Sequence, residues 1–162
     1  MDEFSVSGDY KQYGQLGSYS GKLFLCEDSK VVGFVKDKGI AQQKYIFGKF
    51  TDGFLNFWKI QPLIASRYPI IYAMNNPAKQ FEGEYSGYWG EFVDMKTYAD
   101  MIGEYFPQLM HATVAKSNKE AMSLLEQISL ETFSPFLPDV MFDSLRTLGP
   151  QLGNDASFTI KK

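Results

Sequence analysis

The stretch KYIFGKFTDGFLNFWKI, residues 44–60, contains the clearest local signal in the chain. Asp52-Gly53 at its centre favours a two-residue type I′ turn, in which both central residues take a positive φ. Such a turn pairs Thr51 with Phe54 and fixes the register of the strands on either side of it. The stretch therefore predicts a β-hairpin.

Both faces of this hairpin are largely apolar. In the predicted register the two faces carry, in turn, Tyr45, Phe47, Trp58 and Ile60, and Phe50, Leu55, Phe57 and the charged Lys59. A sheet that is apolar on both sides needs cover on both sides. We expect a barrel interior or a second sheet on one face and helices on the other.

Further strands are expected on both sides of this hairpin. Residues 21–37 form a second predicted hairpin, and 69–74 and 81–89 have the composition of strands. The spacing of the turns between these segments is typical of an antiparallel meander. We expect six to eight strands over residues 4–91.

The composition of the chain changes near residue 92. Residues 1–92 hold 11 of the 14 glycines and 19 of the 26 aromatic residues. Strands followed by helices indicate the α+β class. We expect a single domain over 1–162, with a β-rich part at 1–92, a helical part at 93–150 and a tail at 151–162.

Three helices are predicted in the second part. The first begins after Asp94 and ends before Pro107, and the second follows the capping-box pattern Ser117-Asn118-Lys119-Glu120. The third begins near Pro138 and ends at Gly149-Pro150. Each has an apolar stripe, so we expect about three helices packed on the sheet.

Composition excludes several kinds of site and partner. The single Cys26 and the single His111 exclude multi-cysteine and multi-histidine metal centres, so we expect no metal and no cofactor. The net charge is −3 and the basic residues are scattered, which predicts no nucleic-acid partner. No apolar run reaches the roughly 20 residues that span a bilayer, and no signal peptide is evident. We therefore expect no membrane partner and a cytoplasmic location.

Catalytic motifs are weak. The chain contains no phosphate-binding loop, and Cys26 and His111 have no convincing partner for nucleophilic catalysis. Glu82 and Glu84 project from one strand face about 7 Å apart, which suits a solvated edge better than an acid–base pair. Enzymatic activity is therefore less favoured than ligand binding or protein interaction.

An aromatic-x-Gly-x-apolar pattern occurs at Tyr19–Leu23 and again at Phe81–Tyr85. Over residues 19–89 this pattern, on strongly bent antiparallel strands, resembles small lipocalin-like (calycin) barrels. The resemblance implies a curled sheet or barrel. The Gly-x-Trp signature usual near the N-terminus of such barrels is absent, since both tryptophans lie later.

The leading functional hypothesis is non-catalytic binding of a small, mainly apolar ligand in the curled sheet. Trp58 is the expected central contact, with Phe47 and Tyr45 beside it and Lys49 at the rim. The opposite face of the hairpin is then expected to lie under the helices. The alternative is a protein–protein interaction or homodimerisation module with a fully packed core.

Overall fold

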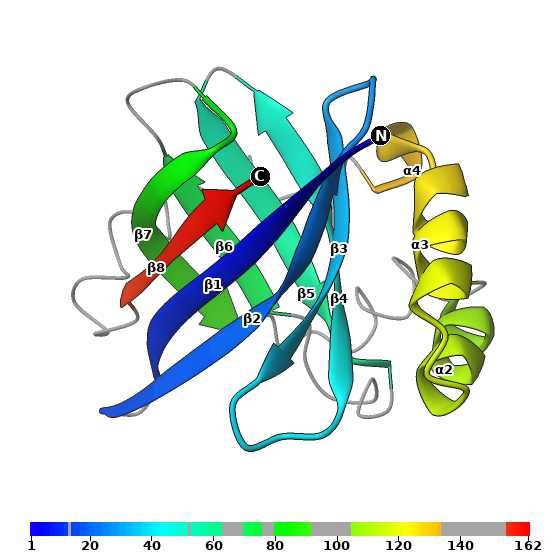
Figure 1. The fold of residues 1–162 in the computed structure, drawn as a ribbon, viewed down its shortest axis with the longest axis horizontal. Helices are drawn as coiled ribbons and strands as arrows, with labels where there is room; N and C mark the ends of the chain where they lie inside the picture. Colours follow the sequence, from blue (N-terminus) through cyan, green and yellow to red (C-terminus); the bar gives the residue numbers. More distant parts are fainter. Residues whose placement is uncertain (13, 52, 63–69, 76–79, 92–104, 134–154) are drawn as a thin grey trace.

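Eight antiparallel strands close into a barrel, each paired with its neighbours in chain order (Figure 1). The computed structural model describes residues 1–162 apart from 13, 52, 63–69, 76–79, 92–104 and 134–154. The strands are β1 (Asp2–Gln12), β2 (Gln15–Leu25), β3 (Lys30–Asp37), β4 (Gln43–Thr51), β5 (Phe54–Ile60), β6 (Ile70–Asn75), β7 (Gly83–Glu91) and β8 (Asp155–Lys161). The predicted α+β class and the antiparallel meander are confirmed.

The central hairpin has the register expected from its turn. Thr51 pairs with Phe54, Phe47 with Trp58 and Tyr45 with Ile60. Gly53 has a φ of 81°, a conformation that favours glycine. The β4–β5 prediction is therefore confirmed residue by residue.

The eighth strand was not predicted. The predicted sheet ends near residue 91 and the tail 151–162 has no assigned element, but β8 pairs with β7 on one side and with β1 on the other. Its burial alternates, with Ala156, Phe158 and Ile160 buried. Because this alternation is short and far from the other strands in sequence, the meander pattern alone does not reveal it.

The interior of the barrel is filled by side chains from alternate strand positions. Its buried members are Phe4, Val6, Tyr19, Leu23, Val31, Val35, Ile46, Leu55, Phe57, Phe81, Tyr85, Trp89, Ala156, Phe158 and Ile160. Leu23, Val31 and Leu55 have exposed fractions of 0%. Water therefore does not reach the side chains of these three residues.

Helices cover the outside of the barrel beside β3 and β4 (Figure 1). They are α2 (Phe106–Val114), α3 (Asn118–Gln127) and the short α4 (Leu130–Phe133). Buried residues of α2 and α3 form one cluster with outward-facing residues of β3, β4 and β5: Val32, Tyr45, Phe47, Trp58, Ile60, Leu109, Ala112, Ala121, Met122, Leu125 and Ile128. This cluster is the second hydrophobic layer of the fold.

The helix predictions have mixed outcomes. The capping box is confirmed in part, since the Ser117 hydroxyl accepts a hydrogen bond from the Glu120 backbone N–H at the start of α3. Pro107, expected to follow a helix, instead lies in the first turn of α2, where its missing N–H costs nothing. Nearly all of the predicted helix between Asp94 and Pro107, and the third predicted helix, lie outside the described residues.

The two faces of the central hairpin are exchanged relative to the expectation. The face with Trp58 lies under α2 and α3, and the face with Phe57 points into the barrel. Both faces are apolar, so a two-residue period separates them without showing which one faces inward. The way in which the barrel closes decides which of the two faces points inward.

Within the described part of the chain, no helix is long and apolar enough to cross a bilayer.

Replacing Trp58 by Ala should lower the free energy of unfolding by about 3–5 kcal/mol. Trp58 is 1% exposed, and its ring fills the layer between sheet and helices. Urea denaturation measures the change, with Leu16→Ala as the control because Leu16 is 79% exposed. A loss of stability no larger than that of the control would contradict the burial of Trp58.

Candidate functional site

Three charged side chains are buried together inside one end of the barrel. Asp37 is the last residue of β3, Lys44 is the second residue of β4, and Lys59 is the next-to-last residue of β5. Their exposed fractions are 4%, 5% and 1%. Because the three strands are adjacent and antiparallel, these positions meet at one rim. We call Asp37, Lys44 and Lys59 the ionic cluster.

Asp37 joins the two lysines. Lys59 Nζ donates a hydrogen bond to Asp37 Oδ1 at 2.7 Å, and Lys44 Nζ donates to Asp37 Oδ2. These hydrogen bonds thus join the two ammonium groups of the ionic cluster to its one carboxylate.

Aromatic rings lie beside the Lys59 end of the ionic cluster. The Lys59 ammonium lies 4.6 Å from the ring centroid of Tyr19 and 5.1 Å from that of Tyr10. Trp89 meets Tyr10 edge-on at 6.1 Å, and its indole N–H donates to the backbone carbonyl of Lys11. Desolvated cation–π contacts of this kind favour the charged form of the lysine.

The protonation equilibria of the cluster are displaced by burial and by its charges. Burial lowers the pKa of Lys59 to about 8; Asp37 opposes this change, whereas the neighbouring Lys44 adds to it. Burial alone would raise the pKa of Asp37, but the charge of Lys59 and hydrogen bonds from both lysines hold it below its ordinary value. Burial, together with the charge of Asp37, raises the pKa of Tyr19 and of Tyr10.

The opposite end of the barrel interior is closed by phenylalanine rings. The Phe81 ring lies edge-on to the rings of Phe4 and Phe50, with distances between ring centroids of 4.8 Å and 5.3 Å. Between the two ends, Tyr85 stacks on Phe158 at 5.0 Å. Aromatic rings therefore pack against one another at this end and in the middle of the interior.

The four residues expected to bind a ligand lie on the outer face of the sheet. Tyr45, Phe47 and Trp58 are brought together, but beneath α2 and α3, where the Tyr45 hydroxyl accepts a hydrogen bond from Thr113 Oγ1 at 3.1 Å. Lys49 is half-buried on the same face, paired across the sheet with Asn56.

The remaining candidates from the sequence occupy ordinary positions. His111, Glu82 and Glu84 are exposed, and Cys26 is half-buried against the helix layer, where burial raises the pKa of its thiol. In the described ranges, no three of the His, Cys, Asp and Glu side chains gather as metal ligands would.

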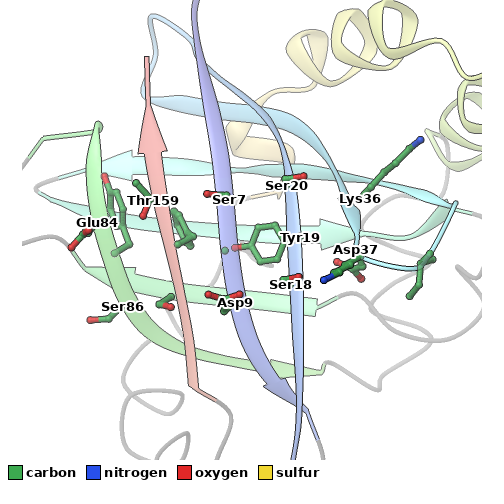
Figure 2. A pocket seen from close by; sticks show the side chains of 16 residues that line it. Ser7, Asp9, Ser18, Tyr19, Ser20, Lys36, Asp37, Glu84, Ser86 and Thr159 are labelled. Carbon is green, nitrogen blue, oxygen red and sulfur yellow. The ribbon is translucent and has the colours of Figure 1, made fainter.

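A hollow, which we call the outer depression, lies on the outer wall of the barrel. It has a volume of about 960 Å³, and small polar side chains from five strands line much of it. Figure 2 shows Ser7 and Asp9 on β1 beside Ser18 and Ser20 on β2, with Glu84 and Ser86 at one end and Lys36 and Asp37 at the other. Asp37 thus borders this depression and also belongs to the ionic cluster.

Sequence reasoning missed the ionic cluster, although one signal for it was present. Lys44 and Lys59 share a hairpin face with Phe50, Leu55 and Phe57. We interpreted Lys59 as the charged member of a face beneath helices. Charges that recur on an apolar face are better taken as candidates for a buried ionic site.

Raising the pH from 7 to 10 should stabilise the protein relative to its Lys59→Met variant. The pKa of Lys59 is about 8 in the folded chain and ordinary in the unfolded chain. Between these values the unfolded state holds a proton that the folded state has lost, so stability rises with pH by about 2 kcal/mol.

Urea denaturation at several pH values measures this difference. A Lys36→Met variant is the control, since Lys36 is exposed on the outer wall, and its pH profile should parallel that of the unmodified protein. Parallel profiles for Lys59→Met as well would show that the pKa of Lys59 is not lowered.

Comparison with known proteins finds no matching family model, curated protein or solved structure.

Proposed function

We propose that the protein binds a small organic acid with an apolar body, without catalysis, at the rim of the barrel that holds the ionic cluster. The single observation behind this proposal is the burial of Asp37, Lys44 and Lys59 inside an otherwise largely apolar barrel. Removing an ion from water costs several kcal/mol, and apolar residues of similar volume often stabilise a fold equally well. Such a cluster in a cavity-forming fold is a candidate recognition site.

The charges of the cluster favour an anion as the ligand. Lys44 and Lys59 are ammonium groups, and an ammonium group forms a strong charge-assisted hydrogen bond with a carboxylate. Of the two, Lys44 is the group that we expect to bind the acid, because it lies near the start of β4 at the rim.

Aromatic rings at the same rim suit an apolar body. Tyr10 is half-buried; its ring and that of Tyr19 lie beside the Lys59 ammonium, and Trp89 packs edge-on against Tyr10. The deeper interior is filled, so the ligand would contact these rings rather than reach the phenylalanines at the far end.

Binding without reaction agrees with the electrostatics of Asp37. A carboxylate whose pKa is held low by two lysines is a weak proton acceptor. Its hydrogen bonds hold both ammonium groups in place, which favours recognition over proton transfer.

A second candidate function is a protein-interaction module with a packed core. The filled barrel interior favours it, as do Met110 and Val114, which are 38% and 69% exposed and lie one turn apart on α2. A Met110→Glu change would convert a dimer to a monomer in sedimentation experiments under this second function and would leave acid binding unchanged.

Octanoate and phenylacetate should raise the unfolding temperature of the protein, whereas octanol and phenylethanol should not. Lys44→Met should weaken octanoate binding about tenfold or more, because a charge-assisted hydrogen bond is worth about 1.5–3 kcal/mol. Titration calorimetry measures the affinities.

Two variants act as controls for this experiment. Lys44→Arg keeps the charge and should keep the preference for acids, and Lys36→Met changes an exposed lysine on the outer wall and should have no effect. Equal binding of octanoate and octanol, or no binding of either acid, would refute the proposal.

A further inference from the structure

The outer depression is a regular grid of polar side chains. One row follows the pairs Glu84–Thr159, Thr159–Ser7, Ser7–Ser20 and Ser20–Lys36 across β7, β8, β1, β2 and β3. The next row contains Ser86, Ser157, Asp9 and Ser18, also directly paired. It ends beside Lys38, whose backbone N–H donates to the Ser18 carbonyl at 2.8 Å.

The hollow follows from side-chain length. Its middle is lined by serines, a threonine, an aspartate and Gly8, with the buried rings of Tyr19, Tyr85 and Phe158 behind them, whereas the longer Glu84, Lys36, Lys38 and Ile40 stand at its two ends. Strands lie about 4.8 Å apart, so five adjacent strands extend over roughly 19 Å. The depression is therefore long enough for an extended small molecule.

The chemistry of the lining is neutral and rich in hydroxyl groups. Each serine or threonine hydroxyl both donates and accepts hydrogen bonds. The outward charges balance, with Asp9 and Glu84 against Lys36 and Lys38, while the Asp37 carboxylate is held by Lys44 and Lys59 inside the barrel. An apolar ligand would leave these hydroxyls without partners, and a strongly charged ligand would meet no matching net charge.

We propose that the outer depression binds a neutral, polyhydroxylated molecule, namely an oligosaccharide that lies across β8, β1 and β2. Each hydroxyl of such a molecule both donates and accepts hydrogen bonds, so it can pair with the serine and threonine hydroxyls of adjacent strands. Asp37 and Tyr19 border both this site and the proposed acid site, but Ser7, Asp9, Ser18 and Ser157 belong to the outer depression alone, so a variant at Ser7 tests this site separately.

A titration of the isotope-labelled protein with neutral trisaccharides tests this proposal. Maltotriose, cellotriose, chitotriose and xylotriose are the probes, and backbone amide chemical shifts are the measurement. At least one probe should shift the amides of Ser7, Asp9, Ser18 and Ser157 in a saturable manner at millimolar concentration.

Ser7→Tyr places a large side chain in the middle of the depression and should weaken the binding about tenfold or more. The matched control is Ser123→Tyr, because Ser123 is exposed on α3, in the helix layer. Octanoate binding should be unchanged in both variants, which separates this site from the acid site.

Three results would overturn the proposal. They are the absence of saturable shifts with every trisaccharide, binding that Ser7→Tyr leaves unchanged, and tighter binding of a trigalacturonate than of any neutral probe. The first would show that the wall is only solvated, and the last would show that the site selects charge.

Discussion

The pairing of β8 with both β1 and β7 is the interaction on which the rest of this structure depends. Without β8, the sheet would have two open edges, each with unpaired backbone groups. Closure also brings Phe158 and Ile160 into the barrel, where Phe158 stacks on Tyr85 and contacts Phe57. A segment of seven residues thus completes both the hydrogen-bond ladder and the interior.

Closure also decides which apolar face points inward. The β4–β5 hairpin could be covered by helices on either side, since Trp58 and Phe57 are equally suited to burial. Once the barrel closes, the face with Phe57 and Leu55 is inside, and the face with Trp58 requires the helix layer. The Lys30 ammonium, which donates to the Glu126 carbonyl at 2.6 Å, shows how closely α3 lies against β3.

Local signals in the sequence predicted local structure well. Asp52-Gly53 predicted the register of β4 and β5, and the Ser117 pattern predicted the start of α3, because each depends on residues only a few positions apart. The eighth strand and the inward face were not predicted, because they depend on contacts between β8 and strands at least 60 residues away. The ionic cluster could have been suspected from Lys44 and Lys59 on one apolar face, but the position of Asp37 beside them follows only from the paired strands.

The end of β3 shows how one strand contributes to two different environments. Lys36 and Lys38 face the outer depression, whereas the carboxylate of Asp37 between them faces the barrel interior. Side chains alternate along a strand, so a shift of one residue in the pairing of Val35 with Lys44 would exchange these environments. It would bring two lysines into the interior and remove the carboxylate that holds Lys44 and Lys59. The register between β3 and β4 is therefore as important to both sites as the identity of the residues that form them.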